Sequence, residues 1–253
     1  MAMDTTSFEI QPIIDLNSSR VCGGEILWRP SGSPPSKEAL EELEDDPKLN
    51  IDVTKNALIL ALNTLSKIQS DAWLSVNFPT KYIGNGSRFF KSVSKELNDF
   101  DLLRRKVGRR LVLELSENDT ESIRNIELLD QLSETHSIAI DDFGTGTAPL
   151  THMLKVDFDK VKVDRSIISG CDVDSRKQRF LNWLIGGCHS IGVSVCTEGV
   201  ETTSELSFLK RAGADTGQGY LWSKSIAVED FENLAVPAQS VAVSLGQVIG
   251  INQ

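Results

Sequence analysis

Acidic and amide side chains recur at or near the ends of short, apolar, β-branched runs of this chain. They are Glu25, Asn77, Glu114, Asp141, Asp142 and Glu198. One such residue needs no function, because strands commonly end at polar residues as the chain leaves the core. Several brought together would repel, since two unit charges ~4 Å apart cost about 4 kcal/mol at an effective dielectric constant near 20. A cluster of this kind therefore requires bound protons or cations.

The oxygen ligands of this set favour hard divalent cations. With no Cys or His nearby in the sequence, carboxylate and amide oxygens suit Mg²⁺ or Mn²⁺. Two ions bridged by Asp141 would form a two-metal site, which polarises an ester and supplies a nucleophilic water. Lys162 lies two residues before the end of its own run. We expect it at the same place, where it would balance charge and orient or deprotonate a water.

Other catalytic signatures are absent. The loop Asp142–Thr147 reads Asp-Phe-Gly-Thr-Gly-Thr, and its glycines predict a mobile loop over the site. Protein kinases also contain Asp-Phe-Gly, but this chain lacks their Gly-rich loop, Val-Ala-Ile-Lys and His-Arg-Asp. A Walker sequence and a Gly-x-Ser-x-Gly nucleophile are missing too, and the histidines His136, His152 and His189 are dispersed.

Eight predicted strands would position these side chains. They are Phe8–Asp15, Gly24–Arg29, Trp73–Phe78, Leu111–Leu115, Ile138–Asp142, Lys160–Asp164, Val193–Glu198 and Gly217–Trp222. Helical segments between them indicate parallel βαβ units, and eight strands in about 250 residues predict a (β/α)8 barrel. A doubly wound sheet is the alternative, but the Gly-rich turn it would need after an early strand is missing. In a barrel the strand ends converge on one mouth.

Three helices are predicted in more detail. The segment 175–185 places Phe180, Trp183 and Leu184 on one face, and Gly192 is expected where the helix ends. A second helix carries leucines at 206 and 209 and ends before Gly213. A third begins at Asn118 with a capping box.

Composition excludes several protein classes. The 253 residues carry 26 Lys and Arg against 36 Asp and Glu, a net charge of −10, which argues against bulk nucleic acid as a partner. No apolar run reaches the roughly 18 residues of a membrane span, and no secretory signal is visible. Four scattered cysteines indicate neither a disulfide framework nor a zinc site, so we expect a cytoplasmic protein.

The motifs, taken in order, resemble a known family. The motifs are Gln11-Pro12-Ile13, Glu25-Ile26-Leu27-Trp28-Arg29, Ser75-Val76-Asn77, Glu114-Leu115-Ser116-Glu117, Asp141-Asp142-Phe143-Gly144-Thr145-Gly146, Lys162-Val163-Asp164-Arg165-Ser166, Glu198-Gly199-Val200-Glu201-Thr202 and Gln218-Gly219-Tyr220-Leu221. This series is similar to that of the EAL domain, the bacterial cyclic di-GMP phosphodiesterase. The resemblance implies a modified (β/α)8 TIM-type barrel as a single domain over residues 8–235, a C-terminal tail of unknown role at 236–253, and often a homodimer.

The resemblance also implies roles for individual residues. Metal ligands would be Glu25, Asn77, Glu114 and Asp141 for one ion, and Asp141, Asp142 and Glu198 for the second. Lys162, Glu198 and Glu25 would act in catalysis, with Lys162 beside the attacking water. Cyclic di-GMP, the small-molecule substrate, would contact Gln11, Leu27, Arg29, Glu201 and Gln218. Glu117 would brace the loop after Asp142.

Two positions depart from the family pattern, and two other functions stay open. Ile26 replaces the central Ala of the signature and should pack behind the strand, and Pro30 stands where an aromatic residue is usual. Some family members that have lost metal ligands are cyclic di-GMP receptors or protein-binding regulators, whereas every ligand position is filled here. An enolase-type lyase on another carboxylate-metal barrel is the remaining alternative.

Overall fold

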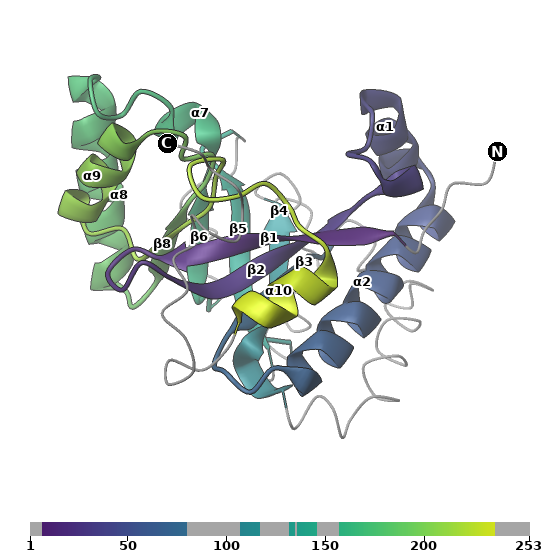
Figure 1. Ribbon diagram of the computed structural model, residues 1–253. Helices are drawn as coiled ribbons and strands as arrows, with labels where there is room; N and C mark the ends of the chain where they lie inside the picture. The colour runs from purple at the N-terminus through teal and green to yellow at the C-terminus, as the bar shows by residue number, and fades with distance from the viewer. Residues whose placement is uncertain (1–6, 80–106, 117–131, 135, 146–156, 236–253) are drawn as a thin grey trace.

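The computed structural model describes residues 7–79, 107–116, 132–134, 136–145 and 157–235. Within them the strands close into a barrel in chain order, β1 to β8, with helices packed outside it (Figure 1). The strands are β1 Phe8–Asp15, β2 Arg20–Trp28, β3 Trp73–Asn77, β4 Leu111–Ser116, β5 Ser137–Phe143, β6 Lys160–Val163, β7 Ser194–Thr197 and β8 Thr216–Gly217. The predicted (β/α)8 barrel is thereby confirmed, and the doubly wound alternative is excluded.

One strand of the barrel runs against the others. β1 pairs antiparallel with both β2 and β8, whereas each pair from β2 to β8 is parallel. Only the short turn after Asp15 joins β1 to β2, and a connection this short permits an antiparallel pair but no parallel one. The mouth therefore gathers the C-terminal ends of β2 to β8 and the N-terminal half of β1.

The helices cover the outside of the barrel. Those in the described part of the chain are η1 Pro30–Gly32, α1 Lys37–Asp45, α2 Pro47–Lys67, η3 Gly108–Arg110, α7 Arg165–Ile168, α8 Ser175–Ser190, α9 Thr203–Ala212 and α10 Val228–Leu234. As predicted, α9 ends at Gly213, whose φ of 89° is the left-handed conformation that glycine favours at a helix end. At its start, Thr202 and Glu205 form a reciprocal capping box. None of the described helices has the length and apolarity to cross a membrane.

The core lies both inside the barrel and between the barrel and its helices. β4 is buried along nearly its whole length, as its apolar residues on both faces predict. α2 contributes a buried stripe that includes Ala57, Leu58, Ala61 and Leu65. All four cysteines are free thiols.

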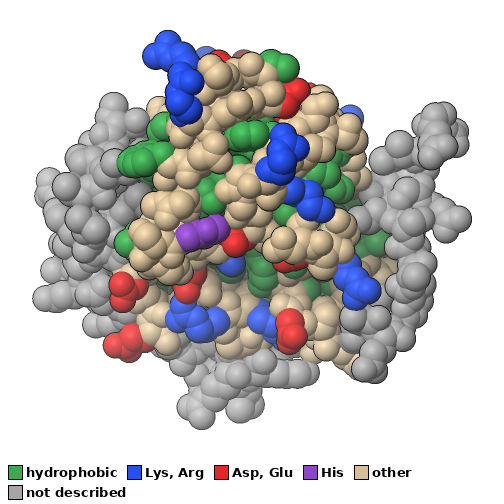
Figure 2. All heavy atoms as spheres, turned by 90° about the vertical axis from the view of Figure 1, so that its left-hand side faces the viewer, with side chains coloured by type: hydrophobic (Ala, Val, Ile, Leu, Met, Phe, Trp, Pro, Cys, Tyr) green, Lys and Arg blue, Asp and Glu red, His purple; other side chains and the backbone are tan. Residues whose placement is uncertain are grey.

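The structure corrects the face predicted for α8. The stripe that packs on the barrel is Leu181, Leu184, Ile185 and Cys188, with helical spacing. Phe180 and Trp183 instead stay 39% and 59% exposed, with ring centroids 5.9 Å apart. Figure 2 views the side of the molecule on which α8 and α9 lie, and hydrophobic side chains reach the surface there between basic ones.

The last strand is shorter than predicted. β8 ends at Gly217, and the rest of the predicted run forms a turn against the loop that follows β7. There, Val200 N–H donates to the Gln218 carbonyl, and Leu221 N–H donates to the Val200 carbonyl. A Cβ on Gly219 would lie 2.1 Å from the Val200 carbonyl oxygen, so only glycine permits this approach. The predicted tail 236–253 and most of the helix predicted from Asn118 lie outside the described residues.

Candidate metal centre and ligand pocket

Carboxylates from separate strands meet at the barrel mouth. Glu25 on β2, Glu114 on β4 and Asp141 on β5 are buried, and each offers an oxygen within 4.8 Å of the others. A second such group joins Asp141 to Asp142 and Glu198. Asp141 belongs to both groups. The structure thus brings together five of the six predicted metal ligands in two overlapping sets.

An irregularity in β5 lets two neighbouring carboxylates serve one site. Successive strand residues normally point to opposite faces, so Asp142 should point away from Asp141. The β5–β6 register shifts between Ile140 and Phe143, and Asp142 has a φ of 53°. Aspartate tolerates this left-handed conformation better than most side chains do. The bulge therefore places Asp142 beside Asp141 and Glu198.

Lys162 occupies the centre of the carboxylate cluster. Its side chain is 2% exposed, and its Nζ lies 2.8 Å from Glu114 Oε1 and 2.9 Å from Asp141 Oδ1. The same Nζ lies 2.9 Å from Glu198 Oε1 and 3.2 Å from Glu25 Oε2. Burial acts to lower the pKa of Lys162, but the surrounding negative charges outweigh it and raise that pKa well above its ordinary value. The ammonium form favours the charge-balancing role predicted for Lys162 over proton abstraction.

The donor set fits divalent cations. Among the described residues, Oε1 and Oε2 of Glu114 and Oδ1 of Asp141 are buried without a well-directed hydrogen bond, although Lys162 lies near. Burial, opposed by Lys162, raises the pKa of Glu114 well above its ordinary value and that of Glu198 to about 8. Protons on such carboxylates offset negative charge in the cluster, and Mg²⁺ or Mn²⁺ could displace these protons and take over that role.

Gln218 braces two of the carboxylates. Its Nε2 donates to Glu25 Oε2 at 2.7 Å and to Glu198 Oε1 at 3.1 Å. The turn after β8 carries this side chain into the mouth, and β1 places Gln11 opposite Glu25 across the hairpin. The two glutamines, predicted to contact the substrate, therefore lie next to the acidic cluster.

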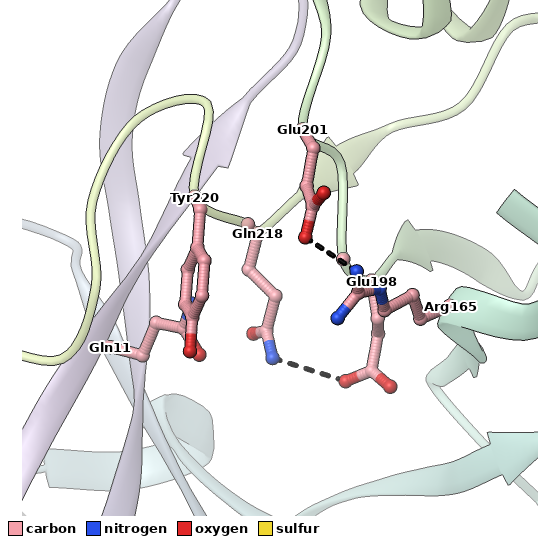
Figure 3. A pocket seen from close by; sticks show the side chains of 8 residues that line it. Gln11, Arg165, Glu198, Glu201, Gln218 and Tyr220 are labelled. Carbon is pink, nitrogen blue, oxygen red and sulfur yellow. Dashed lines mark hydrogen bonds and ion pairs between the residues drawn. The ribbon is translucent and has the colours of Figure 1, made fainter. Parts of the chain in front are cut away.

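An open cavity of about 220 Å³ adjoins the cluster. Its lining includes Gln11, Arg165, Glu198, Gln218 and Tyr220. In Figure 3, Gln11 and Tyr220 lie on one side, Arg165 and Glu198 on the other, and Gln218 between them. The cavity thus combines an aromatic ring, amides and a guanidinium beside the candidate metal ligands.

Glu201 and Arg165 form one wall of this cavity. The Nη2 atom of Arg165 lies 2.7 Å from Glu201 Oε1 (Figure 3). Sequence reasoning placed Glu201 at the pocket but gave no role to Arg165 or Tyr220. Their motifs, Asp164-Arg165-Ser166 and Gln218-Gly219-Tyr220, were the available signal.

The remaining predicted residues take varied positions. Asn77 ends β3 opposite Glu114 and is exposed. Leu27 and Arg29 are not among the described residues that line the cavity. Arg29 is instead held by Glu9 and Ser225, which sequence reasoning missed. Glu117 lies outside the described residues.

Comparison with known proteins decides the family. The family model described as "EAL domain" matches residues 2–225. The chain belongs to the EAL domain family. The match includes every strand of the barrel and every member of the acidic cluster.

Curated relatives of this EAL domain chain include proteins named as probable phosphodiesterases. The probable cyclic di-GMP phosphodiesterase PdeG of Escherichia coli (strain K12) is 26% identical over 244 residues, covering 92% of this chain and 47% of PdeG. The probable cyclic di-GMP phosphodiesterase PdeB of the same organism is 25% identical over 232 residues, covering 87% and 43%. The chain therefore spans about half the length of the curated relatives it matches.

Solved structures share the fold. The EAL enzyme Bd1971, in a form bound to cAMP and cyclic di-GMP, has a TM-score of 0.79 at 25% identity, covering 90% of this chain and 64% of its own. The standalone EAL protein from Vibrio cholerae O395, bound to cyclic di-GMP, has a TM-score of 0.71 at 21% identity, covering 90% and 94%. These two proteins and this chain share the same barrel fold.

Proposed function

We propose that this EAL domain hydrolyses one phosphodiester bond of cyclic di-GMP, giving linear 5′-pGpG, in a reaction that depends on Mg²⁺ or Mn²⁺. The observation that carries the proposal is the pair of overlapping carboxylate groups that share Asp141 beside an open cavity. Family membership and the phosphodiesterase names of PdeG and PdeB support it.

The charges of the cluster support two cations. Five carboxylates, when ionised, would carry five negative charges against the single positive charge of Lys162. Two divalent cations would neutralise the remainder. Glu25, Glu114 and Asp141, with Asn77 beside them, would hold one, and Asp141, Asp142 and Glu198 the other. Bound there, the cations would lower the pKa of a water and neutralise charge on the phosphodiester.

The chain's own residues would orient the reaction. Gln218 fixes Glu25 and Glu198 through its amide, so both carboxylates keep one orientation. Lys162, as an ammonium ion, would orient the attacking water and counter the negative charge that develops on the phosphate. At about 220 Å³ the cavity is below the roughly 300–1,000 Å³ of pockets that enclose a drug-sized ligand, so it would take only part of the dinucleotide.

Several broader predictions belong to the same proposal. We infer one barrel domain over residues 8–235, a cytoplasmic location and a homodimer, with no bulk nucleic acid as partner. The free thiols support the cytoplasmic location. The net charge of −10 argues against bulk nucleic acid as a partner. Sedimentation velocity over a range of protein concentrations measures the oligomeric state.

A turnover assay tests the proposed function. Purified protein is incubated with cyclic di-GMP in Mn²⁺ or Mg²⁺, with an EDTA arm, and the products are separated by chromatography. We expect pGpG only where the divalent cation is present. Binding without any product would contradict hydrolysis and favour the receptor function. An enolase-type lyase would leave cyclic di-GMP untouched.

Glu25→Gln is the matched variant for this assay. It keeps the size of the side chain but removes one ligand charge from the buried cluster. We expect turnover to fall more than about 100-fold, beyond the roughly 10–100-fold loss caused by removing a residue that only supports a ligand. Glu41 lies on α1, and its side chain is 61% exposed. Glu41→Gln makes the same charge change on the surface and should leave turnover unaltered. Full activity of Glu25→Gln would refute the assignment.

A further inference from the structure

Arg29 is a buried guanidinium with all its nitrogens engaged. It follows β2 directly, and its side chain is 10% exposed. Its Nε donates to Glu9 Oε2 at 2.8 Å, its Nη1 to the Trp28 carbonyl at 3.1 Å and its Nη2 to Ser225 Oγ at 2.8 Å. Because alternate strand residues share a face, Arg29 continues the line of Glu25 and Leu27 toward the rim of the mouth.

Glu9 and Ser225 jointly fix the position of this arginine side chain. Glu9 stands opposite Leu27 on β1, and the Ser225 hydroxyl donates to the same Glu9 Oε2 at 2.5 Å. The hydrogen bond from Ser225 and the contact with Arg29 outweigh burial and hold the pKa of Glu9 below its ordinary value, so Glu9 is an anion at neutral pH. These three residues are called the rim cluster below.

The two charged members of the rim cluster differ in exposure to solvent. The Glu9 side chain is 36% exposed, whereas that of Arg29 is 10% exposed. Glu9 could therefore rotate into water without loss of hydration, while Arg29 is held by the surrounding chain. A guanidinium presents a planar fork of donors that matches either a carboxylate or a phosphate. In this structure the Glu9 carboxylate accepts from Nε, one of those donors, and Ser225 accepts from Nη2.

Resting on the proposed function, we propose that Glu9 sets the affinity of the site for its anionic substrate by competing with a phosphodiester group for Arg29. A cyclic dinucleotide carries two phosphodiester charges, and the Arg29 guanidinium at the rim offers a cation to one of them. Binding to Arg29 requires Glu9 to give up its ion pair first. Because the phosphodiester only replaces the Glu9 carboxylate on Arg29, the contact adds less binding free energy, and KM is higher than it would be without Glu9.

Glu9→Gln separates this role from a structural one. The amide oxygen still accepts a hydrogen bond from Arg29, but the competing charge is gone. We expect KM for cyclic di-GMP in Mn²⁺ and Kd measured by titration calorimetry in EDTA to fall about three- to tenfold, with kcat within about twofold. Glu9→Ala, which cannot hold Arg29 at all, should lower KM as well. Thermal unfolding checks that each variant is folded.

Two controls isolate the pair. In an Arg29→Gln background, Glu9→Gln should no longer change KM, because no cation is left to compete for. Asp15→Asn removes one negative charge at the far end of β1, about 20 Å away at ~3.4 Å per residue, and should leave KM unaltered. A general loss of repulsion would instead lower KM in all three cases.

The outcomes distinguish this inference from the proposed function. Turnover by the wild type with an unaltered or higher KM in Glu9→Gln overturns the inference alone. The same fall of KM in the Arg29→Gln background or in Asp15→Asn also overturns it. If neither the wild type nor any variant binds or cleaves cyclic di-GMP, the proposed function fails, and the inference fails with it.

Discussion

Glu114 and Glu198, at the barrel mouth, prefer protons when no cation is present. Burial is the largest cause of the raised pKa of Glu198, about 8, with Lys162 opposing it and the charges of Asp141 and Glu25 adding to it. Glu114 shifts in the same direction, for the same main reason. The metal-free folded state therefore binds protons that the unfolded chain, with ordinary carboxyl pKa values near 4.3, releases.

This difference predicts a pH dependence of stability. A folded-state pKa above the unfolded value contributes stability below about pH 4.5, which is lost as pH rises toward the folded pKa of about 8. The pKa of Lys162 lies well above 10.5, so it adds no slope in this window. We expect the free energy of unfolding in EDTA, measured with urea, to fall from pH 6 to pH 9.

Glu198→Gln is the control for that titration. It cannot ionise, so its stability should fall less steeply over the same interval. A free energy of unfolding that rises with pH in the wild type would contradict the assigned direction. If the free energy of unfolding fell equally steeply with pH in wild type and variant, ionisation of Glu198 would not be the cause of the pH dependence.

At the scale of elements, α8 shows how far a helical pattern predicts a buried face. Leu184 is 4% exposed, while its neighbour Trp183 is 59% exposed. We expect Leu184→Ala to reduce the free energy of unfolding by about 2–5 kcal/mol, since it leaves a cavity. Trp183→Ala should change it by less than about 1 kcal/mol, because little surface is uncovered. Equal losses in urea unfolding would contradict the structure.

Two glycines give a matched test of backbone packing. A Cβ on Gly219 would lie 2.1 Å from a backbone oxygen of Val200, whereas one on Gly187 meets nothing within 4 Å. Gly219→Ala should therefore destabilise the chain by more than about 1 kcal/mol and weaken ligand binding, because Gln218 and Tyr220 would shift. Gly187→Ala, inside α8, should stabilise by about 0.5–1 kcal/mol. Thermal unfolding of both variants measures the difference.

At the scale of the whole molecule, the negative charge and the proposed cations belong together. The acidic cluster joins strands that lie far apart in the sequence, so a cation bound there would link β2, β4, β5 and the end of β7. Binding to the folded state alone adds about 2.7 kcal/mol of stability at a free concentration 100 times Kd. Mn²⁺ at such a concentration should raise the melting temperature.

The variant Glu25→Gln tests where this stabilisation arises. It should lose most of the Mn²⁺-dependent rise, while Glu41→Gln on the surface should keep it. EDTA should return the wild type to its metal-free melting temperature. A rise that persists in Glu25→Gln would show that the cation stabilises the protein elsewhere.

The sequence by itself determined the barrel and most members of the cluster. Both follow from local patterns: apolar runs at regular spacing predict strands, and polar residues at their ends converge once parallel strands close. The resemblance added the order of the motifs and the roles they imply. The end of α9 at Gly213 was equally visible, because a helix stop depends on the backbone freedom of one residue.

Only the tertiary structure decided the rest. Strand alternation points Asp142 away from Asp141, and the β5 bulge reverses this. The face of α8 that is buried is the one that packs against the barrel, and the helical pattern alone does not specify it. Arg29 is paired with Ser225, 196 positions away, and with Glu9 on a strand that runs against its neighbours. The contact with Ser225 forms only when the barrel closes, since no local preference connects residues so distant in the chain.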